Sequence, residues 1–138
     1  MFVNLSAHPS AKWSADQLAK AVEWGGEVQD FPFPTIPPEW GLVDVLNLAR
    51  QVVGEVCEAF GSAQTPTYKV HAPLRGQYVL VQGEASLQTA LHVLLSRQGA
   101  TVVVATSERK SVETVQEDGT TKKESVFEFV RFRLVPKY

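Results

Sequence analysis

Hydrophobic residues recur along the chain with two periods, which predict strands alternating with helices. Short apolar runs at residues 2–5, 78–82 and 101–106 are typical of strands buried on both faces. Residues 27–31 predict one further strand. Between these runs, apolar residues at helical spacing predict three helices. The first has Ser14 as its N-cap, the second spans roughly 42–60, and the third has Ser86 as its N-cap.

Local signals mark the start of the first helix. Ser14 is a favoured N-cap residue and Gln17 stands three positions later, as in a capping box. Trp13 and Leu18 occupy the two positions of a hydrophobic staple. We expect the buried face of this helix to contain Leu18, Ala21 and Val22.

A proline-rich segment follows the strand at 27–31. Four prolines fall within residues 32–38, which excludes a helix or a central strand. The segment predicts an ordered loop that crosses the end of the sheet, with apolar anchors at Phe31, Phe33, Ile36 and Trp40. The stretch 62–76 predicts little beyond a short strand at 68–71, and His71 receives no role.

The hydrophobic period changes to two after residue 111. Asp118 and Gly119 predict a hairpin turn, and the arm at 125–135 carries apolar residues on both faces. We expect this arm inside the sheet or at a subunit interface. The order of elements predicts a single α/β domain over residues 1–138, with a mostly parallel sheet between helical layers and a C-terminal β-hairpin.

Composition narrows the choice of partners. The net charge of −2 over 138 residues lacks the basic excess that sequence-independent binding to duplex nucleic acid requires. A small anionic ligand needs only two or three local cations, which the chain can supply. The single cysteine, Cys57, cannot form an internal disulfide, and no apolar run has the length of a signal peptide or a membrane span. We therefore expect a cytoplasmic protein that does not bind membranes.

Several enzyme classes lack their motifs here. The chain contains no G-x-G-x-x-G fingerprint, no P-loop and no G-x-S-x-G elbow. The three histidines have no metal-ligand spacing, so we expect neither a metal nor a cofactor. Cys57 lies beside the apolar stripe of its helix and predicts a core position. The helical row of Gln88, His92 and Ser96 predicts a solvated or subunit-contact face.

Polar residues gather in the turns after three of the predicted strands. Open α/β sheets bind ligands beyond the carboxyl ends of their strands, where the strand order reverses. The first turn offers Asn4, Ser6, His8 and Ser10. A histidine there is suited to donate to a phosphate or to exchange a proton near neutral pH. The alternative is that these side chains only satisfy the backbone of the turn.

The second turn opens the third helix, whose free N–H groups and dipole favour an anion. It contains Gln82, Gly83, Glu84 and Ser86. The glycine allows close approach of a ligand. Glu84 repels phosphate, but a carboxylate accepts hydrogen bonds from a ribose hydroxyl or an adenine amine.

The third turn runs from Thr106 to Lys110 and contains two adjacent cations. Ser107, Arg109 and Lys110 are its candidate ligand-binding residues, and Arg109 is suited to bidentate phosphate contacts. A solvated charged turn is the alternative interpretation.

Five segments together resemble the small stand-alone CRISPR-associated proteins with a Rossmann-like, CARF-type domain. They are N-L-S-A-H-P-S, W-S-x-x-Q, V-Q-G-E-x-S-L, A-T-S-E-R and F-E-F-V-R-F-R. The resemblance covers nearly the whole chain and implies a Rossmann-like three-layer fold. It also implies a homodimer that binds a cyclic oligoadenylate, most often cyclic tetra-adenylate, across its two-fold axis.

The resemblance further implies metal-independent cleavage, in which a ribose 2′-hydroxyl attacks the adjacent phosphorus. Such a ring nuclease would damp type III CRISPR antiviral signalling. Ser6 would face the phosphates and Gln82 to Ser86 would hold a nucleotide, with His8, Arg109 and Lys110 as the expected catalytic residues. Two alternatives stay open: a sponge or sensor that binds without chemistry, and an unrelated Rossmann-like enzyme acting on a mononucleotide or nucleoside.

Overall fold

A five-stranded sheet organises the chain in a computed structural model, which describes residues 1–62 and 72–137. One short 3-10 helix, η1, precedes the first α-helix. The elements in chain order are β1 (Phe2–Ser6), η1 (Ser10–Lys12), α1 (Ala15–Gly25), β2 (Val28–Asp30), α2 (Leu42–Phe60), β3 (Tyr78–Gln82), α3 (Ala85–Arg97), β4 (Thr101–Val115) and β5 (Thr121–Leu134).

The sheet has the strand order β2-β1-β3-β4-β5. The first four strands are parallel to one another, and β5 runs antiparallel to β4. The expected α/β fold, with a mostly parallel sheet and a C-terminal hairpin, is therefore confirmed. The chain steps from β1 to β2 on one side and then crosses to β3 on the other, so the strand order reverses between β1 and β3.

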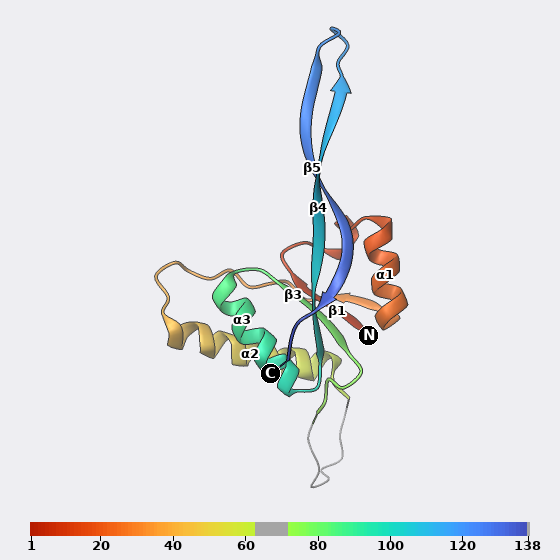
Figure 1. Ribbon diagram of the computed structural model, residues 1–138. Helices are drawn as coiled ribbons and strands as arrows, with labels where there is room; N and C mark the ends of the chain where they lie inside the picture. Colours follow the sequence, from red (N-terminus) through yellow and green to blue (C-terminus); the bar gives the residue numbers. More distant parts are fainter. Residues whose placement is uncertain (63–71, 138) are drawn as a thin grey trace.

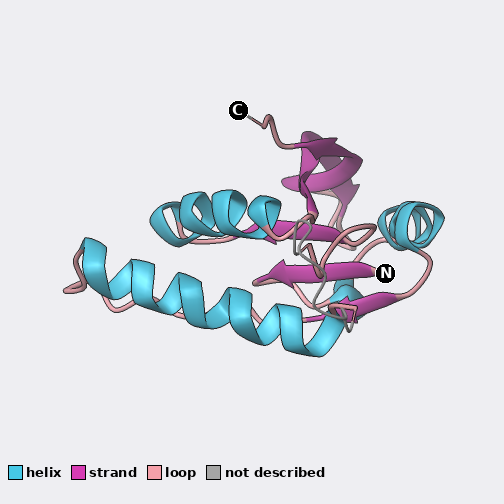
Figure 2. Cartoon of the chain, turned by 90° about the horizontal axis from the view of Figure 1, so that it is seen from below, coloured by secondary structure: helices cyan, strands magenta, loops and turns pink. Residues whose placement is uncertain are grey.

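Helices cover both faces of the sheet (Figures 1 and 2). Helices α2 and α3 pack on one face and α1 on the other, so the predicted helical layers are confirmed. Alternate strand residues point to the two faces and fill two separate cores. The α2–α3 core includes Val3, Leu5, Val79 and Val81, and the α1 core includes Phe2, Ala21, Leu80, Val103 and Phe132.

Helix α1 starts as predicted but turns a different side to the sheet. The Ser14 hydroxyl accepts from the backbone N–H of Gln17 at 3.2 Å, which confirms the N-cap. Ala21 is buried, whereas Leu18 and Val22 are exposed, so the predicted staple and buried face are wrong in these residues. The physical reason lies at the other end of the helix. A Cβ on Gly25 would come within 2.7 Å of Phe2, so α1 lies against β1 through its small residues.

The strand predicted at 101–106 continues to Val115, so the turn predicted at residues 106–110 does not exist. Beyond Thr106, β4 and β5 form a two-stranded ribbon that projects from the domain (Figure 1). The arm at 125–135 lies at the edge of the sheet and not inside it, and Phe132 is its one fully buried residue. The predicted hairpin turn is confirmed, with Gly119 at φ 85°.

The proline-rich loop is ordered as expected. The amide of Phe31 donates to the Asn4 carbonyl at 2.8 Å and that of Phe33 to the Ser6 carbonyl at 3.3 Å, which continues the pairing with β1. Both phenyl rings and Ile36 pack against the α2–α3 core. The strand predicted at 68–71 lies outside the described residues, as does His71. Over the described part of the chain, no helix has the length and apolar character to cross a membrane.

Candidate functional site

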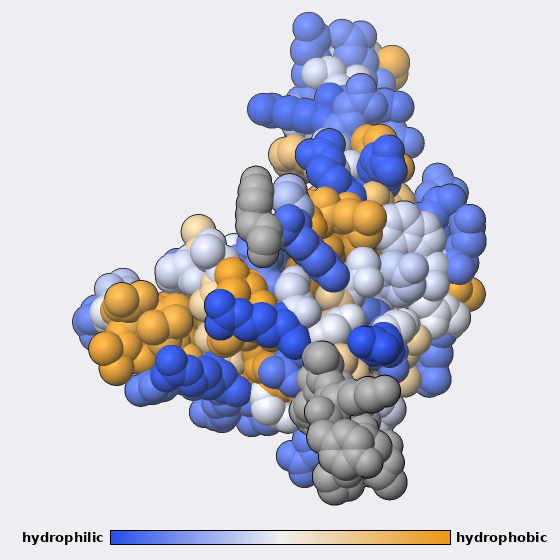
Figure 3. Space-filling model, turned by 60° about the horizontal axis from the view of Figure 1, so that its bottom comes forward, coloured by the Kyte–Doolittle hydropathy of each residue, from blue (hydrophilic) through white to orange (hydrophobic). Residues whose placement is uncertain are grey.

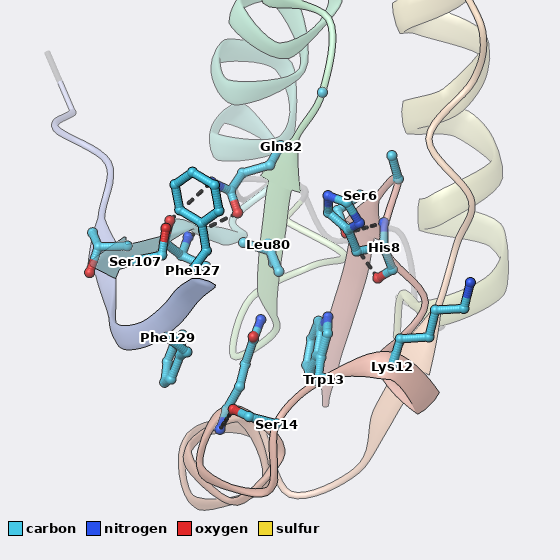
Figure 4. Close-up of a pocket in the computed structure, with 15 residues that line it drawn as sticks. Ser6, His8, Lys12, Trp13, Ser14, Leu80, Gln82, Ser107, Phe127 and Phe129 are labelled. Atoms are coloured by element: carbon cyan, nitrogen blue, oxygen red, sulfur yellow. Dashed lines mark hydrogen bonds between the residues drawn. The ribbon is translucent and has the colours of Figure 1, made fainter. Parts of the chain in front are cut away.

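A pocket opens at the carboxyl ends of β1 and β3 and beside the middle of β4, on the sheet face that α1 covers (Figure 4). It lies where the strand order reverses, which is the usual position of ligand sites in open α/β sheets. Its volume is about 560 Å³, within the range of small-molecule sites. The lining residues come from six elements and their turns: Ser6, Ala7, His8, Lys12, Trp13, Ser14, Gln17, Leu80, Gln82, Gly83, Ala105, Thr106, Ser107, Phe127 and Phe129.

A hydrogen-bond network holds the turn after β1. The buried Asn4 side chain donates through Nδ2 to the His8 carbonyl at 2.8 Å and to Asp30 at 2.9 Å, and its Oδ1 accepts from the Ser6 hydroxyl at 2.7 Å. Ser10 donates to the Asp30 carboxylate from its amide and its hydroxyl. Asn4 and Ser10 thus fix the turn without lining the pocket, whereas Ser6 and His8 line it.

The start of α3 differs from the predicted anion site because a carboxylate of the chain occupies it. Glu84, and not Ser86, is the N-cap, and its side chain accepts from the amides of Ser86 at 3.1 Å and Leu87 at 2.9 Å. The Ser86 hydroxyl and these amides lower the pKa of Glu84. The Glu84 carboxylate thus neutralises the start of α3. Neither Glu84 nor Ser86 lines the pocket, so this helix terminus does not face a ligand there.

Gly83 is required for the packing of Phe33. A Cβ at this position would lie 2.4 Å from the Phe33 ring, closer than carbon atoms approach in proteins. The glycine still lines the pocket beside Gln82. The side chain that approaches its backbone closely is therefore a phenylalanine of the proline-rich loop.

A β-bulge in β5 turns two phenylalanines toward the pocket. The register between β4 and β5 shifts between Thr106 and Ser107, where Val130 is skipped. One extra residue moves every side chain beyond it to the opposite face of a strand. Phe129 and Phe127 therefore point to the face that α1 covers and line the pocket together. Figure 4 shows them on the opposite side of β3 from His8.

The two adjacent cations of β4 lie on opposite faces of the ribbon, because alternate residues of a strand point to opposite sides. Arg109 is in register with Phe127, so both side chains leave the ribbon on the pocket side. Lys110 lies on the reverse face, where its Nζ is 2.8 Å from Glu128, and this ion pair raises the pKa of Lys110. Ser107 lines the pocket, Arg109 lies next to it along the ribbon, and Lys110 points away.

Sequence reasoning missed much of the aromatic and basic lining of the pocket. Lys12 and Trp13 come from η1 and the residue after it, and Phe127 and Phe129 come from the last strand. The alternating aromatic residues of F-E-F-V-R-F-R were the available signal, but their face depends on the bulge. Among the described lining residues there are two basic side chains, Lys12 and His8, and no carboxylate. The pocket is therefore suited to a ligand that is both aromatic and anionic.

Two residues of the helical row on α3, Gln88 and His92, are half-buried and hydrogen-bonded, so the row is not a freely solvated face, and its subunit-contact alternative stays a prediction. Gln88 accepts from the Gly83 amide at 3.0 Å, and His92 Nε2 lies 3.3 Å from the Val81 carbonyl. Burial lowers the pKa of His92, although its bond to Val81 opposes this shift. Nε2 is the donor in this bond, because a carbonyl oxygen only accepts. Within the described residues, no cluster of three histidine, cysteine or acidic side chains could hold a metal ion, and Cys57 is half-buried against the α2–α3 core.

Comparison with known proteins gives a family without a described function. No curated protein and no solved structure matches the chain. One family model, described as the uncharacterized protein MJ1673 family, matches residues 1–133. Because the match covers almost all of the sequence, the chain belongs to the uncharacterized MJ1673 family.

Proposed function

We propose that this protein binds a cyclic oligoadenylate, most favourably cyclic tetra-adenylate, in the pocket between β1 and β3. The main support for this proposal is the set of side chains that line the pocket. Three aromatic side chains and two basic side chains line it, and the described lining contains no carboxylate. Adenine offers a flat aromatic surface and the ring phosphates are anionic, so this ligand class matches both parts of the lining.

Each part of the pocket has a chemical counterpart in the ligand. Phe127, Phe129 and Trp13 offer surfaces on which bases stack, an interaction worth roughly 1–3 kcal/mol per base. Lys12 and Arg109 supply cations for phosphate oxygens, and Arg109 adds a planar fork that suits bidentate contacts. Neither cation forms an ion pair within the described chain.

The topology supports the Rossmann-like interpretation of the fold. The order β2-β1-β3-β4-β5 is that of doubly wound α/β proteins whose ligands sit at the β1–β3 switch point. In those proteins, however, the fifth strand is parallel, whereas β5 here returns antiparallel to β4. A four-adenylate ring has internal two-fold symmetry, which is why we place it across a homodimer with two such pockets.

The proposed reaction is ring cleavage without a metal. A ribose 2′-oxygen forms a bond to the adjacent phosphorus, the bond from phosphorus to the 5′-oxygen breaks, and that oxygen takes up a proton. His8 is the side chain of the pocket best suited to accept the proton of the 2′-hydroxyl, because its imidazole is exposed and makes no side-chain hydrogen bond within the described chain. Lys12 stabilises the charge that develops on the phosphate. Cleavage of this kind damps type III CRISPR antiviral signalling.

Two measurements test the proposal. Isothermal titration with cyclic tetra-adenylate is expected to give saturable binding that Trp13→Ala weakens. Incubation with radiolabelled ring is expected to yield linear products, at a rate that excess EDTA leaves nearly unchanged. Binding without cleavage identifies a sponge, and a rate that collapses with EDTA and returns with manganese refutes the mechanism. Absence of binding overturns the proposal and leaves an unrelated nucleotide or nucleoside enzyme.

A further inference from the structure

A second hollow lies on the other side of the sheet, along the seam between α2 and α3. Its volume is about 620 Å³, and its walls are mostly apolar. Trp40 lines it from the loop before α2, Leu42 and Val45 from the first turn of α2, and Ala90, Val93 and Leu94 from α3. The proposed nucleotide site uses none of these residues. We call this hollow the seam groove.

A protruding apolar end stands beside the seam groove. Leu42 and Val43, the first two residues of α2, are 74% and 68% exposed. Figure 3 shows a hydrophobic surface, in orange, at the end of the molecule where α2 begins. Extended apolar patches on soluble proteins mark surfaces that contact other molecules. The molecule therefore carries an apolar projection next to an apolar groove.

The seam groove and the projecting end of α2 carry charges of opposite sign. Arg50 and Arg97 both line the seam groove, and neither forms an ion pair within the described chain. Glu39 is exposed two residues before Gly41, which caps the projecting end, and it is also without an ion pair there. The groove is thus basic, and the projection beside it has an acidic neighbour.

We propose that the seam groove receives the projecting end of α2 from a second copy of this chain, in a two-fold dimer. In such a contact both copies use the same surface patch. The projection of each copy therefore enters the groove of the other, and the same contact forms twice. Leu42 and Val43 of each copy pack on the apolar walls of the other, and each Glu39 approaches the other copy's Arg50. A peptide or an aliphatic acid in the groove would leave both projections exposed, which is why a second copy fits better.

This contact goes beyond the proposed function, because the seam groove lies on the opposite sheet face from the nucleotide pocket. It is tested without ligand, so that its failure is separate from a failure of nucleotide binding. Sedimentation velocity of the ligand-free wild type at micromolar concentration is expected to show a dimer. Val43→Asp places a charge in the apolar contact of both copies and is expected to weaken the dimer by roughly 100-fold or more. Val115→Asp is the matched control, because Val115 is 75% exposed at the far end of the ribbon.

A charge reversal supplies the second arm. Glu39→Arg and Arg50→Glu are each expected to weaken the dimer at low salt by roughly 10-fold, and the double variant to recover most of it. Circular dichroism checks that each variant is folded, which the exposure of these positions favours. A monomeric wild type overturns the proposal. So does a dimer that Val115→Asp dissociates and Val43→Asp does not, since the ribbon would then be the interface.

Discussion

The side chain of Gln82 makes two hydrogen bonds with the backbone of Ala105. Its Nε2 donates to the Ala105 carbonyl at 3.0 Å, and its Oε1 accepts from the Ala105 amide at 3.1 Å. The last backbone pair between β3 and β4 is Leu80 with Val103, so the two strands have separated at this level. The side-chain amide of Gln82 therefore bridges the two strands beside the pocket, which Gln82 and Ala105 both line.

Replacement of Gln82 is expected to destabilise the domain and loosen the pocket. Gln82→Ala leaves the N–H and C=O of Ala105 without partners in a half-buried position, at a cost of about 1–3 kcal/mol. Urea unfolding at neutral pH measures this cost. Gln116→Ala in the exposed hairpin turn is the control and is expected to change stability by less than about 0.5 kcal/mol. Equal midpoints for the two variants would contradict a role for the side-chain bridge.

A double-mutant cycle tests the contact between Gly83 and Phe33. Gly83→Ala forces the Phe33 ring to move, and overpacking of this kind costs about 1–3 kcal/mol. Phe33→Ala removes the ring and carries its own cost. In the double variant the added methyl group meets no ring, so the two costs are expected to sum to more than the measured total. If the costs of the two single variants add up to that of the double variant in thermal unfolding, Gly83 has another role, such as a backbone conformation or a contact with ligand.

The carboxylate of Glu84 makes helix α3 sensitive to acid. Its pKa is lowered in the folded chain, so it stabilises the fold above its ordinary pKa of 4.5, and this contribution is lost as the pH falls through the folded pKa. Glu84→Gln is expected to unfold at a lower temperature than wild type at pH 7. Below pH 4.5 the gap narrows, because the wild-type carboxyl also becomes neutral.

Glu58→Gln provides the control for this pH profile, since Glu58 is exposed on α2. Its melting temperature is expected to track the wild type across the whole range. A gap between Glu84→Gln and wild type that stays constant from pH 7 to acid would mean that the charge of Glu84 is not what stabilises the helix.

Local pattern predicted most of the fold. The helical spacing of Val45, Ala49 and Val52 predicted α2 with its observed bounds, since a helix buried on one side repeats its apolar residues with the helical period. Ser14 and Asp118 predicted a helix start and a turn, because both signals act within a few residues. These features depend on the chain near them and hence are visible in sequence.

The features that define the pocket depend on distant partners. β4 beyond Thr106 is solvated on both faces, so no apolar period reveals that it is a strand. The bulge at Val130 is a property of the β4–β5 register, and it alone decides which face Phe127 occupies. From the sequence, Gly83 predicts a close approach of ligand. Its observed neighbour is Phe33, which is fifty residues away in the chain, so no local pattern reveals the contact. The ligand itself stays a prediction from resemblance and pocket chemistry.

The final prediction uses Arg109 and Lys110 as a matched pair. The sequence makes them equivalent, as neighbouring cations expected to contact phosphate. In the ribbon, Arg109 lies on the pocket side with Phe127, whereas Lys110 lies on the reverse face and pairs with Glu128. Substitution of either removes one positive charge from the same exposed segment, so a general electrostatic effect would act on both variants alike.

Arg109→Ala is expected to remove a charge-assisted contact worth roughly 1.5–3 kcal/mol. Binding of cyclic tetra-adenylate, measured by isothermal titration, should then weaken by about 10- to 150-fold, and further if a dimer loses two such contacts. Arg109→Lys should recover part of the affinity, since lysine lacks the planar fork. Lys110→Ala should bind as wild type, because its side chain points away from the ligand. If the two alanine variants bind equally, strand alternation does not govern recognition, and the ligand does not extend from the pocket along this face of the ribbon.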